Sequence, residues 1–469
     1  MPSLLDRVHT IPPAVPQSIE ERSVTPAPAV APPAQQKPSL VAPNVSQDKL
    51  RLWLVDRILT GFNAPDEIQR DEKSLTLLHE RFAALYNSAG VNLTPEQVKQ
   101  LERQVLDEIV GFGPIEPLLD DPTITEVMVN GPDHVYIEQE GRVAETKIHF
   151  DDEAHVYRMI ERIIRPLGRR VDRKWPMVDG RLPDGSRVNV IIPPGAIDGP
   201  TITIRKFSKR KLQIEDLIQL DSLTPQMAEF LRACVVARLN IIVSGGTGSG
   251  KTTLLNVLSN FIPDTDRIVT IEDSAELQLA KPHVVRLEAH PADPDGTGRV
   301  TIRDLVVNSL RMRPERIVVG EVRDAAALDM LQAMNTGHDG SLTTLHANTP
   351  RDTISRLETM ALMAGIDFPI KVIREQIASA IDLIVQTARM RDGARKIIQI
   401  TEVQGMEGDI VVMQDVFRFA ERGTDPNGKV LGETKSSGIR PKFTPRLEQY
   451  GFVLPAEMFG GGGTESRRR

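Results

Sequence analysis

The chain has 469 residues, of which 40% are hydrophobic and 26% charged, and its formal net charge is -7. This length exceeds what one hydrophobic core usually serves, so two or three domains are expected. The acidic balance argues against a surface devoted mainly to nucleic acid, although it leaves room for local basic patches. The single cysteine, Cys234, excludes a disulfide within the chain, which suits a reducing cytoplasm.

The N-terminal segment is rich in Pro, Ala, Val, Ser and Gln. Such a segment buries too little apolar surface to offset the entropy lost on ordering, so a disordered arm is predicted over residues 1–46. The start of the chain lacks the features of a signal peptide, and no apolar run approaches the roughly 20 residues that span a bilayer. We therefore expect a cytoplasmic protein that associates with a membrane only through partners.

Two smaller domains are predicted next along the chain. Helical periodicity over residues 47–110 predicts a three-helix unit, whose last helix opens at Thr94-Pro95-Glu96-Gln97 with capping-box chemistry. Residues 111–210 alternate short strand patterns with one amphipathic helix, which predicts an α+β domain. Residues 211–223 are predicted to be a linker.

Helices and short buried strands alternate across residues 224–455. This order is typical of an α/β domain whose parallel sheet is covered on both faces, as in RecA-like nucleotide-binding domains. The part after Lys396 is predicted to be a less regular C-terminal subdomain of this domain. Residues 456–469 are expected to form a flexible tail.

A glycine-rich segment that fits GxxxxGK[ST] follows the apolar strand 240–243 and precedes a helical stretch. Its backbone N-H groups and the helix N-terminus predict a nucleoside triphosphate site, with Lys251 on the β and γ phosphates and the Thr252 hydroxyl on Mg2+. The predicted phosphate-binding residues are Gly245, Gly246, Thr247, Gly248, Ser249, Gly250, Lys251, Thr252 and Thr253.

Carboxylates follow two further predicted strands at the carboxyl edge of the sheet, where ligands bind in open α/β folds. In the segment Glu272 to Glu276, either glutamate or Asp273 could orient the attacking water; the alternative is a solvated acidic turn. Glu321 is expected on the Mg2+ side through water, because the preceding residue, usually aspartate, is Gly320. Arg323 either pairs with an acid or senses phosphate.

Two histidines, His338 and His346, bracket the predicted strand 341–345. A γ-phosphate sensor fits them better than a metal site, because only two imidazoles and no cysteine are at hand. The alternative is that both histidines have only a structural role.

The order of these segments resembles the secretion ATPase superfamily of type II secretion, type IV pili and type IV secretion. Segments 178–187 and 330–338 look like the CpaF/TadA branch, which assembles the Flp (tight adherence) pilus. The resemblance implies ATP hydrolysis with Mg2+ by a homo-hexamer that drives a TadB/TadC-like platform protein of the inner membrane and acts indirectly on pilin. A type IV secretion traffic ATPase is the neighbouring alternative.

The same resemblance implies roles for single residues. Glu276 matches the catalytic base, Glu321 the Walker B carboxylate, and His338 and His346 the histidine box. Arginines of the preceding domain are expected to reach the phosphates, and the candidates are Arg181, Arg187 and Arg205.

A DNA translocase is the remaining alternative. The basic clusters 165–174 and 205–211 favour it, but few aromatic residues accompany them for base stacking. No direct contact with nucleic acid is therefore expected.

Overall fold

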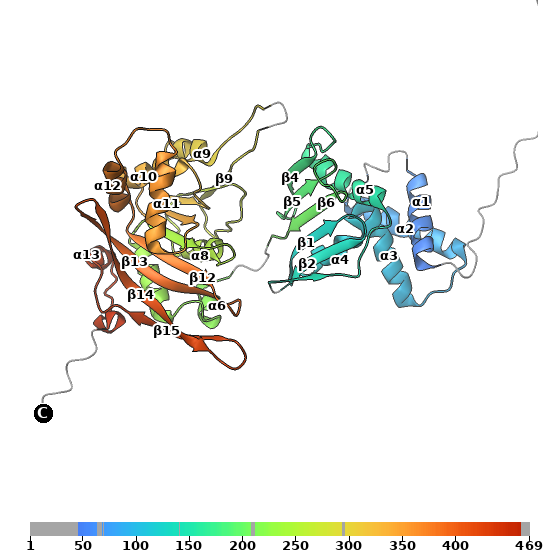
Figure 1. Ribbon diagram of the computed structural model, residues 1–469. Coiled ribbons are helices and arrows are strands. Elements are labelled where there is room, and N and C mark those ends of the chain that lie inside the picture. Colours follow the sequence, from blue (N-terminus) through green and yellow to red (C-terminus); the bar gives the residue numbers. More distant parts are fainter. Residues whose placement is uncertain are drawn as a thin grey trace, which may run out of the picture. The chain divides into compact units, whose positions relative to one another are not determined.

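The computed structural model describes residues 46–62, 68, 70–139, 141–207, 212–292 and 296–460. These fall into two compact units, one up to Gly111 and one from Phe112 onward (Figure 1). The predicted arm over 1–46 lies outside the described residues except for Ser46, whose hydroxyl accepts a hydrogen bond from Lys49 N at the start of the first helix. Within the described ranges, no helix combines the length and apolar character that crossing a bilayer requires.

The first unit contains three helices that share one hydrophobic core. They are α1 (Gln47–Thr60), α2 (Glu72–Ala89) and α3 (Pro95–Val110). The expected capping box at the start of α3 is confirmed, since Gln97 N donates to the Thr94 hydroxyl and Thr94 N donates to the Gln97 side chain. Buried leucines and isoleucines of α1 and α3 form much of the core.

The second unit begins with a six-stranded antiparallel sheet in the order β3-β2-β1-β6-β5-β4. Helix α5 packs its buried apolar residues into the same core as the strands. The elements of this part are α4 (Glu116–Asp120), β1 (Ile124–Asn130), β2 (His134–Gln139), β3 (Arg142–Glu145), α5 (Glu153–Ile164), β4 (Met177–Arg181), β5 (Arg187–Ile191) and β6 (Thr201–Arg205).

The predicted linker over 211–223 is partly wrong. Residues Ile214–Gln219 form helix α6, and Leu217 and Leu223 are buried in the core of the following domain. The side chain of Asp216 accepts a hydrogen bond from Gln213 N at the start of this helix. Apolar residues at these positions give the segment a packing surface that a solvated linker would lack.

The largest sheet has nine strands in the order β15-β14-β13-β12-β7-β11-β10-β8-β9. The six strands from β12 to β9 are parallel. Those strands and the helices between them are α7 (Pro225–Val236), β7 (Ile241–Gly245), α8 (Lys251–Ser259), β8 (Ile268–Glu272), β9 (Val284–Glu288), α9 (Ile302–Ser309), β10 (Arg316–Val319), α10 (Ala326–Asn335), β11 (Leu342–Leu345), α11 (Pro350–Leu362), α12 (Ile370–Ala380) and β12 (Leu383–Arg389).

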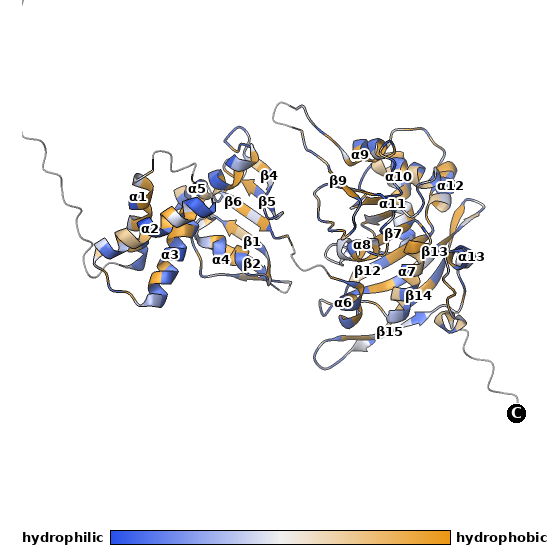
Figure 2. Ribbon diagram, turned by 180° about the vertical axis from the view of Figure 1, so that it is seen from behind, coloured by the Kyte–Doolittle hydropathy of each residue, from blue (hydrophilic) through white to orange (hydrophobic). Residues whose placement is uncertain are grey.

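Both faces of this sheet are covered, which confirms the predicted fold class. Ile241 and Val243 pack with α7 and α8 in one core, whereas Ile242 between them packs with α9 to α12 in another. Successive side chains of a strand point to opposite faces, so a strand covered on both sides reads as an uninterrupted apolar run. Figure 2 shows hydrophobic residues following these strands.

The C-terminal subdomain is more regular than predicted. Its long strands extend the sheet by antiparallel pairing beyond β12. They are β13 (Arg395–Glu407), β14 (Ile410–Thr424) and β15 (Val430–Ser436), followed by helix α13 (Thr444–Gln449). The predicted flexible tail starts too early, because residues Ala456–Phe459 form a 3-10 turn in which Met458 and Phe459 are buried against the domain core.

Candidate functional site

A cavity of about 750 Å3 lies at the carboxyl edge of the parallel strands. Parallel strands bring their carboxyl ends to one edge, so β7, β8, β10 and β11 all deliver residues to it. The predicted site residues that line it are Thr247, Gly248, Gly250, Lys251, Thr252, Thr253, Glu276, Glu321, Arg323, His346, Arg187 and Arg205.

The phosphate loop is shaped by its glycines. Gly248 and Gly250 have φ of 69° and 91°, a left-handed region that favours glycine. An added Cβ at Gly245 would lie 2.6 Å from the Thr387 carbonyl oxygen, so β12 needs a glycine there. Ser249 Oγ donates to Gly246 O at 2.9 Å and closes the turn. The loop thus exposes its backbone at the N-terminus of α8, whose dipole favours anions.

Lys251 is the cation of this loop and is only 7% exposed. Its Nζ donates to Gly246 O at 3.0 Å and lies 3.2 Å from His346 Nε2. Burial lowers the pKa of Lys251, and the nearby carboxylate of Glu321 partly opposes this shift. The hydrogen-bond partners of the ammonium group are therefore neutral. A negatively charged phosphate oxygen can take their place and form a charge-assisted hydrogen bond.

His346 and Glu321 connect Lys251 to the end of β10. His346 Nε2 lies 3.1 Å from Glu321 Oε1, and Arg323 Nη2 lies 2.8 Å from Glu321 Oε2. Burial lowers the pKa of His346, although Glu321 opposes the shift. The hydrogen bond to Glu321 raises the pKa of Arg323, whose other acidic partner is Asp273 at 3.6 Å. Of the two alternatives for Arg323, the structure displays the acid pairing.

The acidic segment after β8 meets the arginines of the preceding sheet. Arg187 Nη1 lies 3.1 Å from Glu276 Oε1, and Arg205 Nη1 lies 3.7 Å from the same oxygen. Arg187 also donates to Ser274 O at 2.7 Å. Arg181 donates to the Ser274 hydroxyl at 3.1 Å and pairs with Glu288 at 3.0 Å, and it does not line the cavity. All three predicted arginines therefore contact the acidic segment that follows β8, and Arg181 also pairs with Glu288 at the end of β9.

The side chains of this edge fit a hydrated Mg2+ ion. Mg2+ is usually held by one or two carboxylates, substrate phosphates and several waters rather than by an all-protein cage. The Thr252 hydroxyl and the Glu321 carboxylate, the two predicted metal residues, both line the cavity. Across the described part of the chain, no group of three or more His, Cys, Asp or Glu residues is arranged to hold a metal. The donor set thus suits a metal that arrives with nucleotide.

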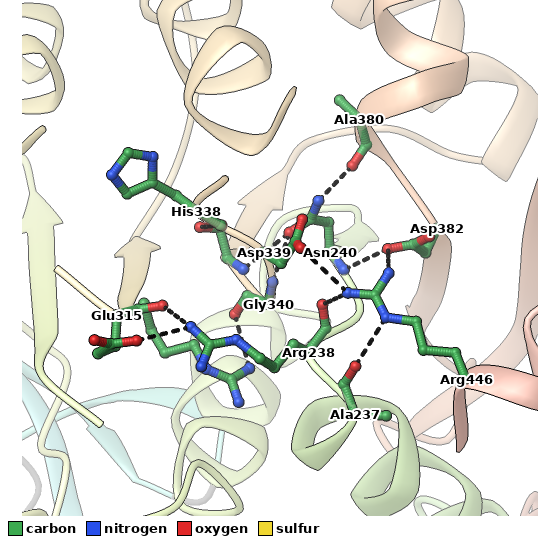
Figure 3. Close-up of polar contacts among 12 residues, drawn as sticks. Ala237, Arg238, Asn240, Glu315, His338, Asp339, Gly340, Ala380, Asp382 and Arg446 are labelled. Atoms are coloured by element: carbon green, nitrogen blue, oxygen red, sulfur yellow. Dashed lines mark hydrogen bonds and ion pairs between the residues drawn. The ribbon is translucent and has the colours of Figure 1, made fainter. Parts of the chain in front are cut away.

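The structure corrects the prediction that His338 shares this site. His346 follows the carboxyl end of β11, whereas His338 precedes its amino end, and His338 does not line the cavity. Its Nδ1 lies 3.3 Å from Ala333 O, and Figure 3 shows its imidazole directed away from the polar residues of the amino edge. A four-residue strand separates opposite edges of a sheet, so the two imidazoles cannot meet at one phosphate within a chain.

The amino edge of the parallel strands, next to His338, holds an extensive network of polar contacts (Figure 3). Asn240 Oδ1 accepts from Gly340 N and Ser341 N, its Nδ2 donates to Ala380 O at 2.7 Å, and its backbone N donates to Asp382 at 2.8 Å. Arg446 of α13 donates to Ala237 O and Arg238 O and lies near Asp382. The buried Arg316 pairs with Asp266 at 2.8 Å. The polar groups of this edge are therefore paired with other groups of the protein.

Sequence reasoning missed one residue of the site and left another undistinguished. Arg395 at the start of β13, which was not predicted, lines the cavity and donates to Gly248 O at 3.0 Å. Glu272, predicted only as one of several acidic candidates, is 3% exposed, and burial raises its pKa against two opposing backbone hydrogen bonds. No local pattern marks Arg395, whereas the position of Glu272 at the end of a buried strand is a usable signal.

The chain is similar in sequence to a known protein family and to several of its members. The profile of the family described as "Type II/IV secretion system protein" matches residues 108–423. A putative conjugal transfer protein of Mycobacterium tuberculosis is 37% identical over 335 residues, which cover 70% of this chain and 94% of that protein. The conjugal transfer protein TrbB of Rhizobium radiobacter is 35% identical over 317 residues, covering 66% and 91% respectively.

The chain is also similar to a protein of solved structure. The crystal structure of the VirB11 ATPase from the Brucella suis type IV secretion system, in complex with sulphate, is 31% identical. The match covers 61% of this chain and 94% of that one, with a TM-score of 0.34.

Proposed function

Because the chain belongs to the type II/IV secretion system protein family and is an ATPase of that family, we propose that it works as a homo-hexameric traffic motor of a type IV secretion or conjugal transfer system. The names of its relatives support this choice, since matches to conjugal transfer proteins cover 66 to 70% of the chain with 35 to 37% identity. The motor acts at the inner membrane through a partner.

One observation carries the enzymatic part of the proposal. The cavity at the phosphate loop is lined from the other side by Arg187 and Arg205 of the preceding sheet, and both pair with Glu276. Arginine binds phosphate oxygens in a fixed, forked geometry. ATP held by Lys251 and the loop would thus engage both sheets at once, so that binding and release move one against the other.

Within this proposal the residues have distinct roles. Lys251 and the loop N-H groups would hold the phosphates, and Thr252 and Glu321 would hold a Mg2+ ion, which when bound would supply charge withdrawal from the phosphate oxygens. Glu276 accepts the proton of the attacking water, and Arg187 and Arg205 neutralise the charge that develops. His346 Nε2 accepts from Lys251 Nζ and orients the lysine, and the imidazole lies between Lys251 and Glu321.

A second function, assembly of a Flp pilus, is favoured by the sequence segments 178–187 and 330–338. Here the partner would be a TadB/TadC-like platform protein and the transported material pilin. The same motor site serves either task, since the residues of the site set the chemistry and do not specify the cargo.

A Lys251→Ala replacement in the source organism separates the two candidates. The traffic function predicts loss of secretion or plasmid transfer with surface filaments retained, as scored by transfer frequency and electron microscopy. Loss of filaments with transfer intact supports the pilus motor. Normal transfer and normal filaments together would contradict both.

The two histidines are expected to respond differently to substitution. His346→Ala removes the group between Lys251 and Glu321, so turnover should fall about 10- to 100-fold, the worth of a hydrogen bond to a charged group. His338→Ala should leave ATP affinity of the isolated subunit within about twofold. Fluorescence titration with an ATP analogue and a phosphate-release assay measure both. A loss of ATP affinity well beyond twofold in His338→Ala would contradict the placement of His338.

A further inference from the structure

Gly320 occupies the position where P-loop enzymes commonly carry an aspartate. Its N donates to Ile271 O at 2.8 Å, and Thr344 Oγ1 donates to Gly320 O at 2.6 Å, which fixes the backbone between two strands. An added Cβ would lie 2.8 Å from Cγ and 3.4 Å from Cβ of Glu272. The space that a side chain at position 320 would need is therefore filled by Glu272 from the adjacent strand β8.

The two oxygens of Glu272 have different surroundings. Oε1 accepts hydrogen bonds from Glu276 N at 2.9 Å and from Leu277 N at 3.0 Å. Oε2 is buried and has no hydrogen-bond partner among the described residues, although Glu272 lines the nucleotide cavity. A buried acceptor without a partner costs about 1 to 3 kcal/mol, so its presence beside a cavity points to a ligand that supplies the missing donor.

We propose that Glu272 supplies, from β8, the carboxylate that is missing at position 320. Its free oxygen accepts a hydrogen bond from a water of the Mg2+ shell, and its bonded oxygen fixes the loop that carries Glu276. Glu272 is thus a positioning residue that links the metal side of the site to the base. This inference rests on the proposed ATPase site.

Glu272→Gln is the informative variant. The amide oxygen can still accept the two backbone hydrogen bonds, so the loop and the ATP affinity measured in EDTA should stay within about twofold of the unmodified protein. The negative charge is lost, so the gain in ATP affinity on adding Mg2+ should fall at least about tenfold, and turnover should fall by a similar factor. Titration of a fluorescent ATP analogue, with and without Mg2+, measures the gain. An unchanged gain would overturn the proposal.

Glu402→Gln is a matched control. Glu402 is 1% exposed on β13, and its Oε1 also accepts from two backbone groups, Lys442 N at 2.6 Å and Phe443 N at 3.4 Å. It does not line the cavity. Glu402→Gln should keep the full gain in ATP affinity on adding Mg2+. If it lost as much of this gain as Glu272→Gln, the effect would come from reduced stability and the proposal would be overturned.

Gly320→Ala tests the packing part of the inference. The new methyl group should displace Glu272 and reduce the Mg2+ gain in the same way. Two changes that act on one contact are not additive, so the double variant with Glu272→Gln should lose little beyond either single variant. Fully additive losses would count against a shared contact.

The outcome also separates this inference from the proposed function. Failure of the unmodified protein to bind Mg2+-ATP would refute the ATPase site itself. Binding and hydrolysis by the unmodified protein, together with an unaffected Glu272→Gln variant, would refute only the role of Glu272.

Discussion

Glu276→Gln is expected to bind ATP with at least the original affinity and to lose about 10^2 to 10^4 of its turnover, or roughly 3 to 5 kcal/mol of barrier. The amide cannot accept the proton of the attacking water. It also releases Arg187 and Arg205, which lie 3.1 and 3.7 Å from Glu276 Oε1 and share its charge. The same arginines cannot pair fully with both the carboxylate and a phosphate, so their release favours nucleotide. Binding and phosphate release are measured separately.

Glu288→Gln is the control for this prediction. Glu288 pairs with Arg181 at 3.0 Å across the same two sheets, yet it does not line the cavity. Its loss removes a partly exposed ion pair without touching the base, so turnover should stay within about threefold. If Glu276→Gln behaved like this control, the assignment of Glu276 as the base would be wrong.

Lys251→Ala is expected to weaken ATP binding at least about 100-fold and to abolish measurable turnover. Lys251 is the buried cation at the floor of the cavity, and its bonds to phosphate oxygens would each contribute about 1.5 to 3 kcal/mol. In the structure Lys251 donates to Gly246 O and His346, which are neutral acceptors. Water can donate to both of them once the lysine side chain is removed. Calorimetric titration with Mg2+-ATP measures the affinity.

Lys281→Ala provides the comparison. Lys281 is also a lysine with a shielded side chain, 12% exposed, but it pairs with Asp264 at 2.9 Å outside the cavity. This variant should bind ATP normally. Unchanged affinity in Lys251→Ala, or an equal loss in Lys281→Ala, would argue against a phosphate site at the loop.

Local signals predicted the parts of the fold that depend on neighbours in sequence. The capping box at Thr94 and the apolar strand before Gly245 are short-range patterns, and both lie where they were expected. A strand was predicted over residues 396–401, but the full length of β13 and the whole of β14 were not, because polar residues interrupt their apolar pattern and glycines such as Gly405 and Gly423 resemble turn signals.

The site was predictable as a set of segments but not as a geometry. His338 was grouped with His346 because the two bracket one strand and match the histidine box of the family, although its place before the strand already indicated the amino edge. Contacts between distant residues, such as Arg187 with Glu276, depend on how two sheets meet, which no local pattern contains. The role of Glu272 became visible only when the space beside Gly320 was known.

The polar network around Asn240 has a mechanical consequence. One amide joins three strands that are neighbours in the sheet, since it bonds to the segments that enter β11 and β12 from the start of β7. Sliding of any of these strands past the next would break several bonds at once and leave buried polar groups without partners. The sheet therefore resists shear at this edge, where the side chain of Asn240 ties the three strands together (Figure 3).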